Sequence, residues 1–531
     1  MRFSVGFLMK NKIFPCTLTP NLTLIYRKNI SSLWRRLERL EAIELESSEK
    51  SLVYQSAKIL ADISSLPRNI MYKRIIPKTE EELIAIKDLY NKIHNKSIQE
   101  LLNPTNFCQI FLNWKPLSYQ ITLLNDKSRQ IVVRWPRQSG KTTTFAAKSL
   151  HFCITKPNSQ ALITSPGLRQ SMIVSDKIDE IINKMDSVAR RAWIKKIQRQ
   201  TITFHNGSRV KVLPYALHRL RGETCDLIFV DEASFIRDDE ILFDNILKPM
   251  LATRWNRDAQ IITSSTPWGK NTMFYRFCKD PQISKDWSQH HVTWRVCVQE
   301  GLIPLEFIEM QKRSISMERF QREYEAEFVE DSDSYFSQDL IAKCLDSELE
   351  YWNFDYLISG KELYAGIDLG KKRDYSVIAV LEKDNGLLKL THLKRFELET
   401  PYASVIGYMK ILFEKWRTFY KICVDQSGVG EYIVEDMRNV GMMNVEGVVL
   451  TMQKKEELLS YLKQIMLESK LKLPYDQDLI IEMNIEKYEI MKDGHIKFSH
   501  IEQSHDDRLW ALALAAYASR GKEYSGMIAI I

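Results

Sequence analysis

The stretch QIVVRWPRQSGKTTTFAAKSL, residues 130 to 150, decides the fold of the region around it. It begins as a short apolar run, continues through a loop that contains Gly140, Lys141 and Thr142, and ends in a helical pattern. In such a strand, loop and helix, backbone amides cradle phosphate groups, the lysine reaches the terminal phosphates, and the hydroxyl binds Mg²⁺. The loop is unusual because Trp135 stands where the first glycine is expected. We interpret it as a nucleotide-binding loop for ATP with Mg²⁺.

An acidic motif further along the chain supports this interpretation. DLIFVDE (226–232) has four apolar residues followed by Asp231 and Glu232. At the end of a buried strand, the aspartate can hold Mg²⁺ through water and the glutamate can position the attacking water. Arg137, inside the loop, can act as an arginine finger that stabilises charge in the transition state. The structural alternatives are solvated acids and a surface arginine, but the order and context of the motifs favour a nucleotide site.

Beyond about residue 100 the sequence alternates between short apolar runs and helical patterns, which is typical of an α/β domain with a parallel sheet. Four runs end in polar residues: QIVVRW (130–135), QALITS (160–165), DLIFVDE (226–232) and AQIITSS (259–265). Ligands of open α/β sheets bind beyond the carboxyl ends of the strands, so we expect these ends to share one crevice. TITFHNGSRVKVL (201–213) predicts a hairpin turning at Asn206 and Gly207. Earlier, residues 31–86 read as helical and NPTNF (103–107) as a turn.

Aspartates in the C-terminal half stand at the edges of further expected elements. Asp368 ends one apolar run, Asp425 ends another, and the pair Asp506 and Asp507 precedes a helix rich in alanine and leucine. Converging carboxylates without a Cys/His cluster suit Mg²⁺ or Mn²⁺, and two such ions clamp a phosphodiester for hydrolysis. Taken singly, each aspartate is more often a turn residue or a helix N-cap. Their joint placement favours a metal site, with His505 as a neighbour rather than a ligand.

Composition bounds the class of protein. A chain of 531 residues is too long to fold around one hydrophobic core, so we expect roughly two to four domains. A formal net charge of +7 permits a polyanionic partner without requiring one. The eight cysteines are scattered singly, which predicts unpaired thiols in a reducing compartment. We expect neither membrane insertion nor secretion, because no apolar run is long enough to span a bilayer and the N-terminal apolar stretch is short and lacks a cleavage-site pattern.

Together these motifs resemble the large terminase subunit of tailed bacteriophages and related viruses, the motor and nuclease that packages DNA. That family often carries an early arginine and lacks the first glycine in its phosphate loop, as in RQSGKT (137–142). KPLSYQ (115–120) is similar to the family's adenine-recognising segment, and TSSTPWGKNTMFY (263–275) to its coupling motif. HRLRGETCDLIFVDEA and FQREYEAEFVED also resemble segments of its motor domain. The resemblance covers about residues 114 to 520.

The resemblance implies roles for individual residues. It implies that Gln120 reads the adenine base and that Ser265 and Thr266 sense hydrolysis. The expected nucleotide contacts are Gln120, Arg137, Gln138, Ser139, Gly140, Lys141, Thr142, Asp231, Ser265 and Thr266, with Thr142 also on the metal ion. The expected catalytic residues are Glu232, Arg137, Asp368, Asp425 and Asp507. The expected nuclease metal ligands are Asp368, Asp425 and Asp507, with Asp374 as an auxiliary ligand; Asp506 is the alternative to Asp507, which we favour.

The implied architecture is α/β, with four parts in order along the chain. A helical N-terminal extension (1–100) precedes a P-loop ATPase motor domain of the ASCE type with a parallel-core sheet (101–330). A linker (331–355) then leads to a ribonuclease H-like α/β nuclease domain (356–531).

The implied function is ATP-driven translocation of double-stranded DNA into a procapsid, with a two-metal endonuclease that cuts concatemeric DNA. The implied partners are duplex DNA, a portal protein and the small terminase subunit. The chain would be a monomer in solution and a homo-oligomeric ring on the portal, in the host cell cytoplasm where virions assemble. Two alternatives stay open: a DNA helicase or repair ATPase with a fused nuclease, and a catalytically silent docking subunit derived from a provirus.

Overall fold

The computed structural model describes residues 45–329, 334–354, 361–370, 374–417, 419–427, 430–490, 496–499 and 505–520. The start of the predicted helical extension, up to residue 44, lies outside these ranges. The chain forms two compact units, described separately below. Of the described residues, one unit contains those up to Ile98 together with Asp186–Ala192, and the other contains Gln99–Met185 and those from Trp193 onward.

The first unit is helical, as predicted for residues 45–86. Its helices are α2 (Ser47–Ser64), α3 (Arg68–Ile75) and α4 (Glu80–Ile93). Helix α4 begins where the Thr79 hydroxyl accepts a hydrogen bond from the amide of Glu82, and three glutamates in its first turn complement the helix dipole. The unit also includes most of α10 (Ser187–Trp193), a segment distant in sequence, and an ion pair of 2.5 Å joins Arg191 to Glu82.

The second unit opens with helices where a turn was expected. These helices are α6 (Pro104–Phe111) and α7 (Ser118–Asn125), and the short α5 (Ile98–Leu102) precedes them. The prediction that NPTNF forms a turn is wrong, because Asn103 is a helix N-cap whose side chain accepts from the amides of Thr105 and Asn106. Proline at the first helical position has no amide to satisfy and is compatible with the helix.

An eight-stranded sheet forms the first core of this unit, in the order β3-β4-β5-β2-β6-β7-β1-β8. Its strands are β1 (Gln130–Arg134), β2 (Gln160–Ser165), β3 (Ile194–Gln198), β4 (Thr201–Phe204), β5 (Arg209–Pro214), β6 (Leu227–Val230), β7 (Gln260–Ser264) and β8 (Ser288–His291). From β5 to β8 all neighbours are parallel, whereas β3, β4 and β5 pair antiparallel. The four predicted strands are therefore adjacent, and the predicted hairpin is β4–β5. Both expectations are confirmed.

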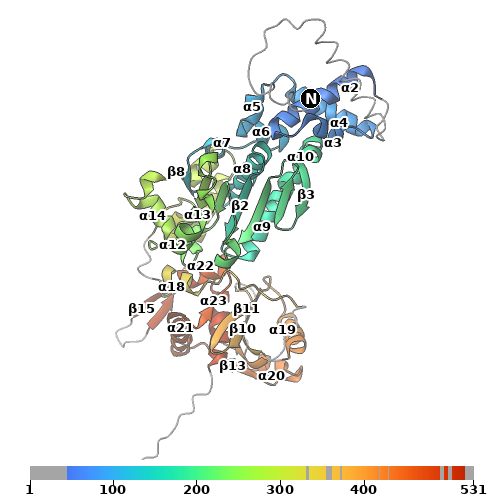
Figure 1. The fold of residues 1–531 in the computed structure, drawn as a ribbon. Coiled ribbons are helices and arrows are strands. Elements are labelled where there is room, and N and C mark those ends of the chain that lie inside the picture. The colour runs from blue at the N-terminus through green and yellow to red at the C-terminus, as the bar shows by residue number, and fades with distance from the viewer. Residues whose placement is uncertain are drawn as a thin grey trace, which may run out of the picture. The chain divides into compact units, whose positions relative to one another are not determined.

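Helices cover both faces of this sheet, which explains why its central strands are apolar throughout (Figure 1). One face packs on α8 (Lys141–Thr155) and α9 (Leu168–Lys184), where Phe145 stacks on Phe229 of β6. Ile228 and Val230 point to the other face, whose core includes Phe243 and Phe277. The remaining helices of this region are α11 (Leu217–Leu220), α12 (Asp239–Leu242), α13 (Lys248–Ala252), α14 (Met273–Lys279), α15 (Trp294–Gln299), α16 (Leu305–Ser314) and α17 (Met317–Glu323).

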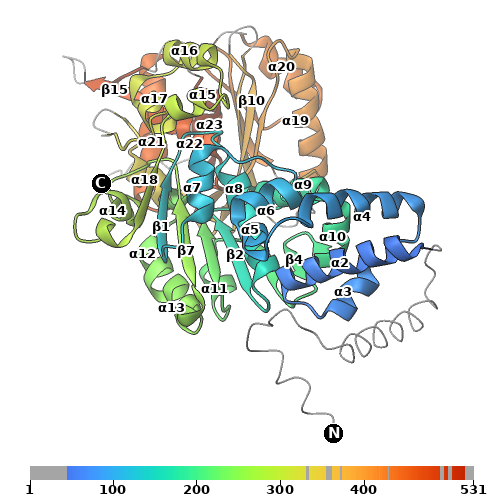
Figure 2. The ribbon, with the colours of Figure 1, turned by 90° about the horizontal axis from the view of Figure 1, so that it is seen from above.

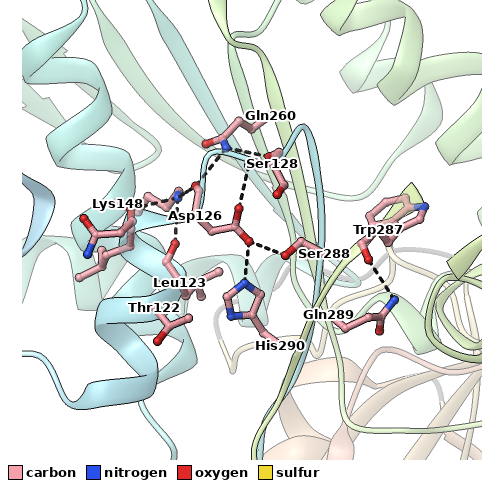
Figure 3. Close-up of polar contacts among 12 residues, drawn as sticks. Thr122, Leu123, Asp126, Ser128, Lys148, Gln260, Trp287, Ser288, Gln289 and His290 are labelled. Atoms are coloured by element: carbon pink, nitrogen blue, oxygen red, sulfur yellow. Dashed lines mark hydrogen bonds and ion pairs between the residues drawn. The ribbon is translucent and has the colours of Figure 1, made fainter. Parts of the chain in front are cut away.

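A buried lysine ties α7 to α8. At the end of α7, the ammonium of Lys148 donates to the backbone oxygens of Leu123 (2.9 Å) and Asp126 (2.8 Å), as Figure 3 shows. It also donates to the backbone oxygen of Leu124 at 3.2 Å. Burial lowers the pKa of Lys148 to about 8. The Asp126 carboxylate accepts from the hydroxyl of Ser288 and contacts the ring of His290. These contacts link the end of α7 to β8.

We expect Lys148→Met to destabilise the fold by about 3 kcal/mol, because it removes the three hydrogen bonds that the buried ammonium donates to carbonyl oxygens at the end of α7. The measurement is chemical denaturation of the full chain. Lys156→Met is the matched control, since Lys156 follows the same helix but is about a third exposed and pairs with the exposed Asp258. Equal effects of the two substitutions would contradict the prediction.

A six-stranded sheet forms the second core, in the order β13-β12-β9-β10-β11-β14. Its strands are β9 (Glu362–Asp368), β10 (Val377–Asp384), β11 (Leu387–Arg395), β12 (Phe419–Asp425), β13 (Val445–Val448) and β14 (Leu471–Lys472). Strands β9, β10 and β11 form an antiparallel meander, and β12 and β13 continue it in parallel beyond β9. This is the arrangement expected of a ribonuclease H-like domain, and the predicted fold class is confirmed.

The helices of this region lie on both sides of the second sheet (Figure 2). One face packs on α19 (Tyr402–Trp416) and α20 (Tyr432–Asn439), and the other on α18 (Gln338–Cys344), α21 (Met452–Leu467), α22 (Gln477–Ile485) and α23 (Asp507–Ser519). Helix α23 lies so close to β9 that a Cβ at Gly366 would be 2.1 Å from the carbonyl oxygen of Ala511. Glycine in the strand and alanines in the helix permit this approach. A separate hairpin, β15 (Lys487–Ile490) and β16 (Ile496–Ser499), follows α22.

The two sheets share packed residues. Phe235 and Trp268, which follow β6 and β7 of the first sheet, belong to the same hydrophobic core as β10, α21 and α23. Seven of the eight cysteines lie in the described residues, and all seven are buried and free, as predicted. Among the described residues, no helix is long and apolar enough to cross a membrane.

Candidate active sites

The phosphate loop follows β1 and leads directly into α8. Gln138 and Gly140 have positive φ angles of 60° and 82°, so the loop turns sharply before the helix. No side chain caps the start of α8, and the first amides of this helix are therefore available to a phosphate. Thr142 stands in the first turn, and Lys141 donates to the carbonyl oxygen of Trp135 at 3.3 Å. These features fit a bound nucleotide.

Helix α7 holds the loop from one side. The hydroxyl of Tyr119 and the amide of Gln120 both donate to the carbonyl oxygen of Ser139, at 2.8 and 3.1 Å. The other end of the Gln120 amide accepts from the backbone of Leu117. Trp135 is buried and packs edge-on against Tyr119, with ring centroids 4.8 Å apart. Trp135, which stands in place of the usual glycine, therefore stabilises the loop by packing against α7. Gln120 of the same helix contacts the loop backbone directly.

Arg137 is held by Glu323, the last residue of α17. Its backbone amide donates to the carbonyl oxygen of Glu323 at 2.9 Å, and its guanidinium lies 3.6 Å from the Glu323 carboxylate. The same carboxylate binds Arg319 at 3.1 Å. The Arg137 side chain is 38% exposed, so its guanidinium is open to a ligand on one side.

The two acids after β6 lie against the end of β7. The Ser264 hydroxyl donates to Asp231 at 2.8 Å, and the Ser265 hydroxyl donates to Glu232 at 3.2 Å. The amide of Thr266 points to the same Glu232 oxygen at 3.4 Å. Because β6, β7 and β1 are neighbours, the acids, the predicted coupling motif and the phosphate loop share one edge of the sheet.

Charge and burial act against each other at Glu232. Burial raises the pKa of this carboxyl, the nearby Lys141 ammonium lowers it, and Asp231 raises it. Glu232 also has a positive φ of 50°, which is uncommon for a non-glycine residue and more frequent at functional sites. A buried carboxylate within electrostatic range of the phosphate-loop lysine has the placement of a general base beside a phosphate.

The second candidate site lies where β9 and β12 end. Asp368 and Asp425 are the last residues of these adjacent parallel strands, and Asp507 is the first residue of α23, which packs on β9. Burial and the negative charges of Asp507 and Asp425 raise the pKa of Asp368 well above its usual value, with smaller contributions from Asp506 and Asp374. The structure therefore brings all five predicted carboxylates within electrostatic range of one another.

Asp506 and Asp507 differ in their surroundings. The Asp506 carboxylate accepts from the indole of Trp510 at 2.7 Å. Asp507 is buried, and burial raises its pKa to about 7. Its Oδ2 atom is buried without a hydrogen-bond partner and lies 3.7 Å from the His505 ring. A buried carboxylate oxygen of this kind fits a hard divalent cation.

The carboxylates share an edge without forming a closed ligand set. In the part of the chain that the structure describes, no three acidic, histidine or cysteine side chains are gathered closely enough to make a ready-made metal cluster. Asp425 uses one oxygen to accept from the amide and hydroxyl of Ser427, at 2.8 and 2.6 Å. Like charges repel in a buried site, and a cation would draw them together.

Several contacts at these sites involve residues that the sequence reasoning left without a role. Trp268, within the predicted coupling motif, packs under the guanidinium of Arg322, which donates to Asn484 of α22 at 2.7 Å. Arg508, beside Asp507, forms a buried ion pair with Glu482 of α22. Trp268 lies within the predicted coupling motif. However, no local sequence pattern indicates that α22 would contact both Arg322 and Arg508.

The two sites define a class of protein: a P-loop nucleotide-hydrolysing domain followed by a ribonuclease H-like, metal-dependent nuclease domain. The family model described as "Terminase large subunit, T4likevirus-type, N-terminal" matches residues 134–343. The large terminase subunit of Thermus phage G20c is 26% identical over 470 residues, which cover 80% of this chain and 91% of that protein. Over most of its length the chain is similar to large terminase subunits.

Solved structures of large terminases also resemble the chain. The magnesium-bound large terminase nuclease from thermophilic phage G20c is 25% identical, covers 35% of this chain and 97% of its own, and has a TM-score of 0.30. The large terminase ATPase domain of Thermus phage P74-26 is 23% identical, covers 41% of this chain and 96% of its own, and has a TM-score of 0.34.

Proposed function

We propose that this chain is the packaging motor of a virus: it hydrolyses ATP to move double-stranded DNA into a procapsid, and it cuts concatemeric DNA with a two-metal endonuclease. The observation that supports this proposal is that one chain carries, at the edges of two sheets, a phosphate-type loop beside the acids Asp231 and Glu232 and a group of mutually interacting aspartates. The similarity to large terminase subunits supports it. A silent docking subunit has no need of a buried Glu232 facing Lys141, nor of converging aspartates.

In the proposed motor site, the phosphate loop from Gln138 to Thr142 holds the phosphates of ATP, with Thr142 and Asp231 on Mg²⁺. Glu232 takes the proton of the attacking water, and Arg137 faces the transferred phosphoryl group after leaving Glu323. Ser265 and Thr266 contact the Glu232 carboxylate directly. A shift of the Glu232 side chain on hydrolysis would therefore move Ser265 and Thr266, which follow β7, through these hydrogen bonds. We also assign Gln120 to the adenine, from its position beside the phosphate loop.

In the proposed nuclease site, Asp368, Asp425 and Asp507 hold Mg²⁺ or Mn²⁺, with Asp374 as an auxiliary ligand. The unpartnered oxygen of Asp507 favours this residue over Asp506, whose carboxylate is engaged by Trp510. The metal pair, when bound, supplies an activated hydroxide and stabilises the leaving oxygen. The chain's own residues place the carboxylates at one edge, where a phosphodiester backbone can reach them.

The proposed partners are duplex DNA, a portal protein and the small terminase subunit, in the host cell cytoplasm where virions assemble. We propose a monomer in solution that forms a homo-oligomeric ring on the portal. Grip on DNA would be mainly through phosphates, so sequence specificity would be low. A helicase with a fused nuclease is the rival enzyme, and unwinding of a forked duplex by the purified chain would favour it.

The test is an ATPase assay with and without duplex DNA, beside nicking of plasmid DNA with Mg²⁺ or Mn²⁺. We expect ATP turnover that duplex DNA stimulates, and nicking that a chelator abolishes. DNA binding should weaken steeply with salt, by about 1000-fold between 50 and 200 mM if roughly six phosphates are contacted. A flat salt response would contradict phosphate grip, and absence of ATP hydrolysis by the folded chain would contradict the motor assignment.

A further inference from the structure

Helix α23, which begins with Asp507, receives its cap from another helix. Asp506 stands at the N-cap position, but its side chain accepts no hydrogen bond from the first amides and binds the Trp510 indole instead. The first amides of a helix have no partner within the helix. Here an oxygen of Glu482, on α22, accepts from the Arg508 amide at 2.7 Å. Because this amide belongs to the peptide group that follows Asp507, Glu482 binds the backbone directly beside the proposed metal ligand.

A second contact strengthens this attachment. The other Glu482 oxygen accepts from the Arg508 guanidinium, which also binds the Asp478 carboxylate one turn earlier on α22, at 3.0 Å. Glu482 is 5% exposed and Arg508 is 8% exposed. Hydrogen bonds to charged groups are strongest away from water, so a movement of the first turn of α23 would break two strong contacts at once.

Helix α22 is itself held by contacts outside α23. Asn484, two residues after Glu482, accepts from the Arg322 guanidinium at 2.7 Å and donates to the Phe336 carbonyl oxygen at 3.2 Å. Residues 479–485 of this helix are all buried. Helices α22 and α23 lie side by side (Figure 2). Glu482 is therefore a fixed point against which the start of α23 is placed.

The direction of the Asp507 carboxylate follows from the position of this turn. Its side chain is short and buried, and its Oδ2 atom has no hydrogen-bond partner. Mg²⁺ demands nearly ideal octahedral geometry, with oxygen ligands at about 2.1 Å. A small displacement of the first turn of α23 would therefore move this oxygen out of reach of an ion held by the other aspartates.

We propose that Glu482 is a positioning residue of the nuclease. By accepting from the Arg508 amide, it holds the first turn of α23 so that the Asp507 carboxylate points to the metal ions. This inference rests on the proposed nuclease function and its metal site. Glu482 acts through Asp507 rather than on an ion, so its loss lowers the affinity for metal even where the fold is kept.

The test removes the acceptor without leaving a buried charge. In the double variant Glu482→Met with Arg508→Met, apolar side chains replace the ion pair, which folds commonly tolerate. We expect the dissociation constant for Mn²⁺, measured by calorimetry on the full chain without nucleotide, to rise about 10-fold, as is typical for groups that support metal ligands. The Mg²⁺ concentration for half-maximal nicking should rise in parallel. ATP turnover should stay within about 2-fold of the wild type, because its site is distant.

Glu482→Gln with Arg508→Met is the matched control. It lacks the same guanidinium but keeps a side-chain oxygen for the amide, so the two variants differ only in this acceptor. We expect its Mn²⁺ dissociation constant to stay within about 3-fold of the wild type, because the hydrogen bond to the amide persists.

An unchanged dissociation constant in the Met/Met variant overturns the inference, as does an equal rise in both variants, which would assign the effect to the ion pair. Loss of ATP turnover in the Met/Met variant would assign its defect to folding and also overturn the inference. A wild-type chain that binds no Mn²⁺ would instead refute the proposed metal site.

Discussion

Replacing Glu232 with alanine is expected to abolish ATP turnover, with kcat falling by at least about 100-fold, and to leave metal-dependent nicking of plasmid DNA intact. The expectation rests on the position of this carboxylate: it is buried, faces Lys141, and is held by Ser265 and Thr266. KM for ATP should change little, because the phosphates are held by the loop and Lys141. The measurement is steady-state hydrolysis with and without duplex DNA.

Glu223→Ala is a suitable control for this substitution. Glu223 lies in the same sheet region, pairs with Lys211 at 2.6 Å, and precedes β6, whereas Glu232 follows it. We expect its ATPase activity to stay near that of the wild type. Full ATPase activity in Glu232→Ala would show that the assignment of the catalytic glutamate is wrong.

Replacing Asp368 with alanine is expected to have the opposite outcome: nicking falls by more than about 100-fold, while ATP turnover persists. Even residues that only support metal ligands are typically worth 10- to 100-fold, so a ligand should be worth more. The same substitution should stabilise the fold in a buffer with chelator. Asp368 is buried among other carboxylates that raise its pKa, so removing it relieves desolvation and repulsion.

This pairing of lost activity with higher stability separates a metal ligand from a structural turn residue, whose removal would lower stability. Unfolding midpoints and nicking rates should be measured on the same preparations. Asp384→Asn serves as the control, because Asp384 ends β10, is exposed, and pairs with Lys389. Retained nicking by Asp368→Ala would contradict the metal site.

The sequence predicted the parts of the fold that local pattern determines. Apolar runs with polar ends identified β1, β2, β6 and β7, and Asn206 with Gly207 identified the hairpin, because these signals lie within a few residues of the elements they specify. NPTNF was misread because an Asn-Pro pair opens a helix as readily as it forms a turn. The domain boundaries and the roles of the site residues stay predictions.

Partners of individual polar atoms could not be predicted in this way. The family resemblance implied that Gln120 lies at the nucleotide, but only the three-dimensional arrangement shows that its amide binds the Ser139 carbonyl. The burial of Trp135 depends on Tyr119, which arrives on a separate helix. Residues 186–192 join the helical first unit although the sequence around them belongs to the motor. Each of these facts depends on long-range packing, which neither composition nor periodicity encodes.

The hydrophobic core that includes Phe235 and Trp268 affects how the chain can be divided for experiments. A fragment that ends at residue 330 keeps the phosphate loop, the acids and the coupling motif, but it loses the nuclease-side residues that cover these two aromatic rings. Turnover measured on such a fragment would describe an altered enzyme. For the same reason, exchanging nuclease domains between relatives would have to carry compatible partners for both rings, so the two halves are expected to evolve as one unit.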